Sequence, residues 1–131
     1  MQDGKYVILC VDDDDDVLLF LKTVLETKGY KVVTARNGEE GIREYKKEHP
    51  DLIILDLMME TVDAGTNFVK ELKLLGNTAP ILLLSSVGDN LNMTADYSTL
   101  GLAGVLQKPI DDQHLLVLVE SKLKQTKEDA S

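Results

Sequence analysis

The chain has 131 residues, the length of one domain, and 44% of them are hydrophobic, a proportion that argues against a disordered chain. Its 14 basic residues stand against 23 acidic ones, so the formal net charge is −9. This excess of negative charge argues against a nucleic acid or an anionic membrane as the main partner, because both carry the same sign of charge. A metal cation or a basic protein surface fits the charge better.

The sequence contains neither a cysteine framework nor a long apolar segment. Cys10 is the only cysteine, so an internal disulfide is impossible. No stretch approaches the roughly 18 apolar residues that a membrane helix needs. The first residues lack the basic and apolar regions of a secretory signal. We therefore expect a soluble, cytoplasmic protein that does not bind membranes.

Five short apolar runs divide the chain, at residues 6–11, 31–35, 52–55, 81–84 and 104–106. The first, third and fourth runs are apolar at consecutive positions instead of alternating ones. This pattern is typical of strands that are covered on both faces, as in a parallel sheet between two layers of helices.

Amphipathic segments with helical spacing separate these runs. They lie at residues 17–28, 37–49, 68–75 and 115–123, and a weaker one spans 89–99. Asn37, with Glu40 three residues later, predicts a helix N-cap, and Pro50 prevents that helix from continuing beyond His49. Alternating strands and helices predict a (βα)5 fold of the α/β class, with a doubly wound parallel five-stranded sheet.

Polar side chains follow four of the five apolar runs. Asp12 and Asp13 follow the first run, Asp56 closes the third, Ser85 follows the fourth, and Lys108 follows the fifth. Ligands of open parallel sheets bind beyond the carboxyl ends of the strands. We therefore expect these five side chains to form one polar site.

Converging carboxylates restrict what such a site can bind. Two carboxylates about 4 Å apart repel each other by roughly 4 kcal/mol at an effective dielectric constant near 20. Three of them either acquire raised pKa values or recruit a cation, for which Mg²⁺ is the usual occupant. With the metal bound, Lys108 and Ser85 could stabilise a phosphoryl transition state, and Asp56 is the best candidate nucleophile.

Each acidic residue also has a simpler interpretation. The run from Asp12 to Asp16 could be acids at a helix N-terminus, where the helix dipole favours negative charge, with Asp14 as the cap. Asp56 could be a structural carboxylate with satisfied hydrogen bonds. The coincidence of four strand ends favours a shared site for Asp12, Asp13 and Asp56.

Four motifs together resemble the receiver domain of two-component response regulators. They are residues 8–13, residues 50–59, residues 80–86 and the pair Lys108-Pro109, and the resemblance extends over about residues 6–123. It implies a flavodoxin-like sheet with strand order 2-1-3-4-5. It also implies a phospho-accepting signalling switch that catalyses its own phosphorylation and dephosphorylation and is not otherwise an enzyme.

The resemblance assigns a role to each acidic site residue. Asp56 matches the phosphoacceptor, which takes a phosphoryl group from the phosphohistidine of a histidine kinase or phosphotransfer protein. Asp13, Asp56 and the backbone carbonyl of Met58 match the protein ligands of Mg²⁺. Asp12 matches the second member of the acidic pair, which often acts through a metal-bound water.

The remaining motif residues match the phosphoryl-binding switch, with two departures. Ser85 matches the hydroxyl that turns toward the phosphoryl group, Lys108 the lysine that pairs with it, and Pro109 a proline that commonly follows a cis bond. Val105 stands at a switch position that is commonly aromatic, so the usual hydroxyl-to-aromatic coupling cannot operate in that form. The loop at residues 60–67 lacks the usual Pro-Gly turn.

Two further functions are weighed against the receiver. A phosphohydrolase of the haloacid dehalogenase type also uses an Asp nucleophile and Mg²⁺, but it needs a general acid two residues later, where this chain has Met58. A degenerate receiver would act only as a binding module.

The domain organisation expected from the sequence is a receiver at residues 1–125 and a frayed polar tail at 126–131. The expected partners are the phosphodonor and either a downstream protein or a missing output domain, with no direct contact to nucleic acid.

Overall fold

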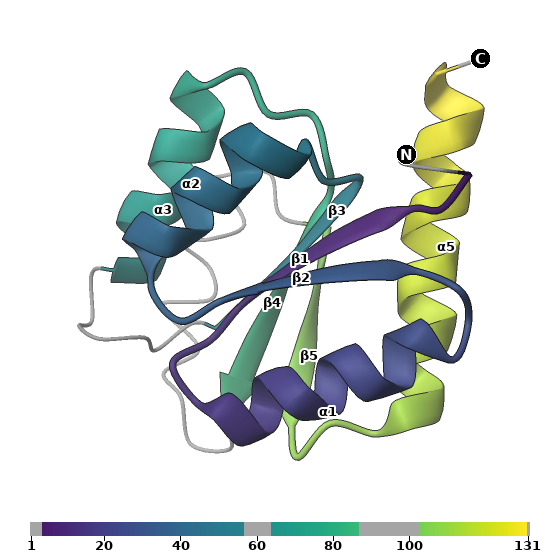
Figure 1. Cartoon of the computed structure of the whole chain (residues 1–131). Coiled ribbons are helices and arrows are strands. Elements are labelled where there is room, and N and C mark those ends of the chain that lie inside the picture. Colours follow the sequence, from purple (N-terminus) through teal and green to yellow (C-terminus); the bar gives the residue numbers. More distant parts are fainter. Residues whose placement is uncertain (1–3, 57–63, 87–102, 131) are drawn as a thin grey trace.

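The computed structural model describes residues 4–56, 64–86 and 103–130, and its five parallel strands form one sheet (Figure 1). The strands are β1 (Val7–Val11), β2 (Lys31–Ala35), β3 (Leu52–Asp56), β4 (Ile81–Ser86) and β5 (Gly104–Lys108). Their order is β2-β1-β3-β4-β5. The predicted fold class and strand order are therefore confirmed.

Four described helices cover the two faces of the sheet. They are α1 (Asp15–Glu26), α2 (Gly38–Glu48), α3 (Ala64–Leu74) and α5 (Asp112–Ala130). Helices α1 and α5 pack on one face, and α2 and α3 pack on the other (Figure 1). Asn37 caps α2 as predicted, because its side-chain oxygen accepts a hydrogen bond of 2.8 Å from the Glu40 N–H.

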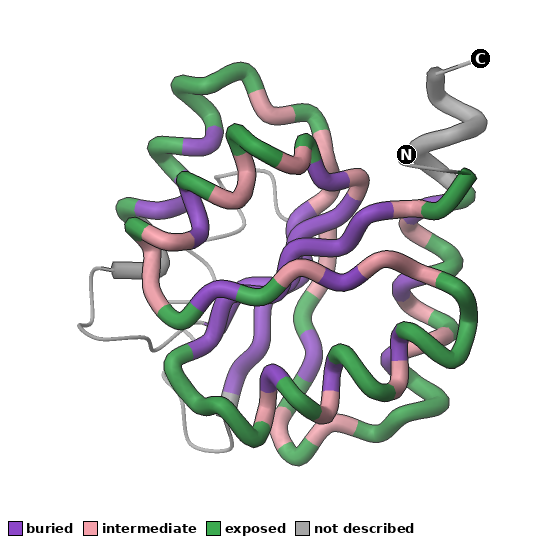
Figure 2. The backbone as a smooth tube through the Cα atoms, in the orientation of Figure 1, coloured by how far each residue is buried: buried purple, intermediate pink, exposed green. Residues whose placement is uncertain are grey.

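The core consists of two apolar clusters, one on each face of the sheet. Strands β1 and β3 are buried along their whole length (Figure 2). Their side chains alternate between the cluster under α1 and α5, which includes Ile8 and Ile54, and the cluster under α2 and α3, which includes Leu9 and Leu55. This two-sided burial explains why the corresponding runs in the sequence are apolar at every position.

The C-terminal segment differs from the sequence-based expectation. The sequence predicts a frayed tail from residue 126, but α5 continues through Ala130. Gln, Lys, Glu and Ala in this segment are good helix formers, which accounts for the longer helix. The weak helical pattern at residues 89–99 lies outside the described residues. Within the described part of the chain, no helix combines the length and the apolarity needed to cross a membrane.

Candidate functional site

Three charged side chains reach the same edge and the same face of the sheet. Asp12 directly follows β1, Asp56 is the last residue of β3, and Lys108 is the last residue of β5. Side chains on a strand repeat their direction every two residues, so each charged residue continues a row of core residues that faces α1 and α5. The core residues two positions earlier are Cys10, Ile54 and Leu106.

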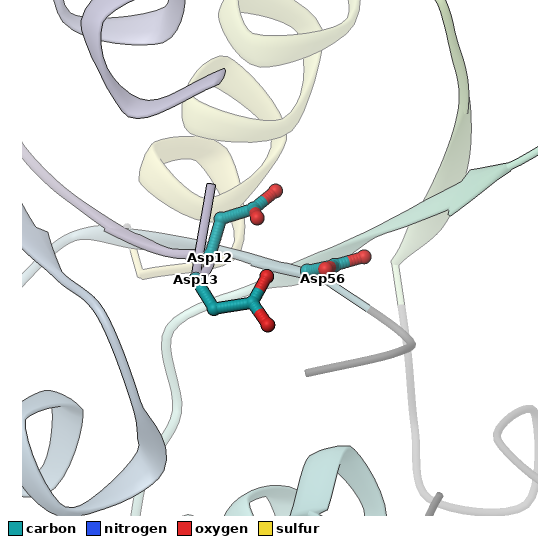
Figure 3. A group of neighbouring side chains, drawn as sticks. All are labelled: Asp12, Asp13 and Asp56. Atoms are coloured by element: carbon teal, nitrogen blue, oxygen red, sulfur yellow. The ribbon is translucent and has the colours of Figure 1, made fainter. Parts of the chain in front are cut away.

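Asp12, Asp13 and Asp56 form an acidic cluster (Figure 3). One carboxylate oxygen from each lies within 4.8 Å of the others. Asp12 is 0% exposed and Asp56 is 4% exposed, whereas Asp13 is on the surface. The cluster is therefore buried at Asp12 and Asp56 and open to solvent at Asp13.

Lys108 supplies the positive charge that faces this cluster. Its Nζ lies 3.0 Å from Asp12 Oδ2 and 3.4 Å from Asp56 Oδ1. Burial alone would lower the pKa of Lys108, but the hydrogen bond to Asp12 and the charges of Asp56 and Asp12 together raise that pKa above its usual value. Lys108 is thus held protonated, yet one ammonium faces three carboxylates.

The two oxygens of Asp12 have different surroundings. Oδ1 accepts a hydrogen bond of 2.9 Å from the Asp14 N–H. Oδ2 is buried and forms an ion pair with the Lys108 ammonium at 3.0 Å. Each oxygen of this buried carboxylate therefore has a partner, the Asp14 N–H for Oδ1 and the Lys108 ammonium for Oδ2.

This donor set fits a hard divalent cation. Mg²⁺ prefers oxygen ligands, and three carboxylate oxygens that lie within 4.8 Å of one another are near enough to converge on one ion. Asp12, Asp13 and Asp56 would hold the ion, which would offset their excess negative charge. Of the predicted Mg²⁺ ligands, Met58 lies outside the described residues.

The next acids in the run belong to the start of α1. Asp14 is the N-cap, and its Oδ1 accepts a hydrogen bond of 2.9 Å from the Asp16 N–H. Asp15 pairs with Arg36 at 3.0 Å, where both side chains are more than half exposed. These contacts agree with the interpretation of Asp14, Asp15 and Asp16 as helix-start residues.

The other predicted site residues lie in β4 and β5 or directly after β5. Ser85 is buried and lies one position beyond Leu84, the residue that pairs with Asp56 in the sheet. The Lys108–Pro109 peptide bond is cis, as the resemblance implied. Val105 is 41% exposed and pairs with Leu83.

The backbone around Asp12 is a part of the site that the sequence analysis missed. The Asp12 N–H donates a hydrogen bond of 3.1 Å to the Ala35 carbonyl at the end of β2. Together with the bond from the Asp14 N–H, it fixes both the backbone and the side chain of Asp12. An aspartate two residues before a helix N-cap is a common Asx-turn pattern, which could have indicated the second bond.

Comparison with known proteins identifies the family. Residues 8–120 match the model of the response regulator receiver domain. The chain is 36% identical over 129 residues to a protein named probable transcriptional regulator ycf27 from Cyanophora paradoxa, covering 96% of this chain and 52% of that protein. It is 32% identical over 119 residues to the alkaline phosphatase synthesis transcriptional regulatory protein PhoP of Bacillus subtilis, covering 91% and 49%. The chain thus spans about half the length of these curated relatives.

Solved structures show the same similarity in three dimensions. A response regulator receiver domain protein from Clostridium thermocellum superposes with a TM-score of 0.84 at 27% identity, covering 93% of this chain and 97% of that one. Neither the phosphohydrolase nor the degenerate receiver finds support in these matches. The chain belongs to the response regulator receiver domain family, and it is a receiver domain of two-component signalling.

Proposed function

We propose that Asp56 accepts a phosphoryl group from a phosphohistidine with the help of Mg²⁺. The observation that carries the proposal is the position of this carboxylate. Asp56 is buried at the end of a central strand, shares a cluster with Asp12 and Asp13, and lies 3.4 Å from the Lys108 ammonium. The Lys108 ammonium offsets the charge of this carboxylate, and the cluster meets solvent at Asp13, where a donor can approach.

The transfer needs only groups that this site and the donor supply. An Asp56 carboxylate oxygen forms a bond to phosphorus, the phosphorus–nitrogen bond of the phosphohistidine breaks, and its electron pair returns to the imidazole. The product is an acyl phosphate on Asp56. Lys108 stabilises the negative charge on the phosphoryl oxygens. Bound Mg²⁺ would supply further charge neutralisation to the same oxygens.

The roles of the neighbouring residues are part of the same proposal. Ser85 would donate its hydroxyl to a phosphoryl oxygen, and the backbone carbonyl of Met58 would complete the protein ligands of Mg²⁺. Pro109, the residue after Lys108, would support the position of that lysine at the end of β5. Since Val105 has no aromatic ring, we propose that phosphorylation changes the surface near β5 without an aromatic switch.

The partners follow from the family and the charge. A histidine kinase or phosphotransfer protein would donate the phosphoryl group in the cytoplasm, and a downstream protein or an attached output domain would respond to it. The curated relatives that are named as transcriptional regulators are about twice as long as the matched region. The net charge of −9 argues against direct contact between this domain and nucleic acid.

Labelling with a small phosphodonor tests the proposal. The protein is incubated with phosphoramidate or acetyl phosphate in Mg²⁺ or in EDTA, and the bound phosphate is measured. We expect one acid-labile acyl phosphate per chain in Mg²⁺ and almost none in EDTA. Asp56→Asn removes the nucleophile and should abolish labelling, whereas Asp15→Asn, at an exposed acid of α1, should leave it unchanged. Equal labelling of Asp56→Asn and the wild type would show that Asp56 is not the acceptor.

A further inference from the structure

Helix α2 approaches the ring of Phe68 so closely that only glycine fits at one position. A Cβ atom on Gly41 would lie 2.7 Å from Cε2 and 3.1 Å from Cζ of Phe68, and 3.2 Å from Cγ2 of Val11. Carbon atoms that are not bonded to each other do not approach to 2.7 Å without displacing their neighbours. Glycine is also a poor helix former, so its presence in the middle of α2 calls for a packing reason.

The ring of Phe68 lies in the core cluster that also contains the residues directly before Asp12 and Asp56, Val11 and Leu55. Phe68 is 2% exposed and Val11 is 0% exposed, and both belong to the core under α2 and α3. Val11 is the residue directly before Asp12. Phe68 lies in the second turn of α3, the first described element after Asp56. Helices α2 and α3 lie side by side on this face of the sheet (Figure 1).

Because this contact is closely packed, a displacement of the Phe68 ring is passed on to the residues around it. A tightly packed interior does not absorb an added methyl group locally, so the ring or the end of β1 must move. Mg²⁺ demands ligands near 2.0–2.1 Å in almost ideal octahedral geometry, and shifts of a few tenths of an ångström in a ligand therefore weaken its binding.

We propose that Phe68, held against Gly41 and Val11, is a positioning residue that sets the separation of Asp12, Asp13 and Asp56 for Mg²⁺ binding. The inference rests on the proposed function, because it presupposes that the acidic cluster binds the metal. The alternative is that Phe68 only fills the core. In that case, changing the contact would lower stability and leave the Mg²⁺ affinity of the folded protein unchanged.

Four variants separate these two roles. Gly41→Ala forces a Cβ into the ring, and Phe68→Leu leaves a gap where the ring was. The double variant of these two changes puts the new methyl group into that gap. Gly38→Ala is the matched control, since it makes the same substitution one turn earlier on α2, where the new Cβ would lie 3.8 Å from Phe68 Cδ2, an ordinary contact distance.

The measurement is the Kd for MgCl₂, obtained by titrating the backbone amide signals of the folded protein by NMR. Unfolding midpoints in EDTA are recorded separately. We expect Gly41→Ala and Phe68→Leu each to raise the Kd by about tenfold, the lower end of what supporting residues of metal sites contribute. Gly38→Ala should change it by less than about twofold, and the double variant should bind more tightly than either single variant because its two changes compensate.

The outcomes distinguish this inference from the proposed function. If the wild type does not bind Mg²⁺, the metal site itself is wrong and the inference falls with it. If the wild type binds and Gly41→Ala binds equally well, or if the two single effects simply multiply in the double variant, Phe68 does not position the cluster. Should Gly41→Ala fail to fold, an unchanged Kd in Phe68→Leu overturns the inference alone.

Discussion

Replacing Lys108 by methionine is the perturbation that most clearly separates the electrostatics of the site from its packing. Methionine has a stem of similar length but no charge, so Lys108→Met removes the ammonium from the cluster. In the wild type, Lys108 Nζ lies 3.0 Å from one oxygen of Asp12 and 3.4 Å from one oxygen of Asp56. At an effective dielectric constant of about 20, each of these contacts is attractive by about 5 kcal/mol.

The net loss is smaller than these attractions, because burying the charges in the wild type has its own cost. Removing one partner of a buried ion pair typically costs about 3–5 kcal/mol. The Lys108 side chain is 21% exposed and thus partly screened by water, so we take the lower end. We expect the free energy of unfolding in EDTA to fall by about 3 kcal/mol.

The same variant should respond more strongly to Mg²⁺. Without the ammonium, the repulsion between Asp12 and Asp56 is offset less until the cation binds, so the affinity for Mg²⁺ should rise by about tenfold or more. Each factor of ten in affinity adds about 1.4 kcal/mol of stabilisation at saturating metal. Mg²⁺ should therefore restore part of the stability that Lys108→Met loses.

Urea unfolding in EDTA and in excess Mg²⁺ provides the assay. The control is Lys22→Met, at an exposed lysine in the middle of α1, which should change stability by less than about 0.5 kcal/mol in both conditions. If Lys108→Met is as stable as the wild type in EDTA, the ion pairs do not stabilise the fold. If Mg²⁺ stabilises both proteins equally, Lys108 and the cation do not share the same carboxylates.

Three further predictions concern single features of the site and the core. Asp13→Asn removes one repelling carboxylate, so it should raise the melting temperature in EDTA and weaken the stabilisation by Mg²⁺; an unchanged response to Mg²⁺ would exclude Asp13 as a ligand. Burial, with a smaller contribution from the Asp12 charge, raises the pKa of the Cys10 thiol, so the folded protein keeps a proton that the unfolded chain releases. Stability should therefore fall as the pH rises above about 9, and Cys10→Ala should flatten that decline in unfolding measured from about pH 7 to pH 10. Met58 and Val87 stand two residues after Asp56 and Ser85 in the sequence and lie outside the described residues. Neither side chain can orient an attacking water by hydrogen bonding, so a Met58→Asn, Val87→Glu double variant should lose its phosphoryl group roughly five- to thirtyfold faster than the wild type. Equal rates would show that these two side chains do not slow the hydrolysis.

Sequence patterns predicted the sheet well because a strand that is buried on both faces is apolar at consecutive positions. The strands β1 and β3 are buried at every position, and in a chain of this size their short, continuous apolar runs indicate strands inside a parallel sheet. The edge of the sheet where the site lies was predictable from the same pattern. In a parallel sheet, the residues that follow the strands, such as Asp12 and Lys108, must meet at one edge.

Features that depend on tertiary contacts could not be predicted in this way. The sequence grouped Lys108 with three carboxylates but did not indicate that its ammonium lies nearer to Asp12 than to Asp56. The contact between Gly41 and Phe68 joins residues of two helices and has no local pattern. The extension of α5 to Ala130 is a different case, because the polar composition of this segment suggests a frayed end while the helix propensity of its residues favours a helix.

Mapping the phosphorylated residue shows directly whether Asp56 is the phosphoacceptor. After phosphorylation in Mg²⁺, borohydride reduces an aspartyl phosphate to homoserine, and peptide mass spectrometry locates that change. We expect homoserine at position 56 alone, with Asp12 and Asp13 intact, and no conversion when Mg²⁺ is replaced by EDTA. Homoserine at another position, or equal conversion without Mg²⁺, would contradict the assignment of Asp56 as the metal-assisted phosphoacceptor.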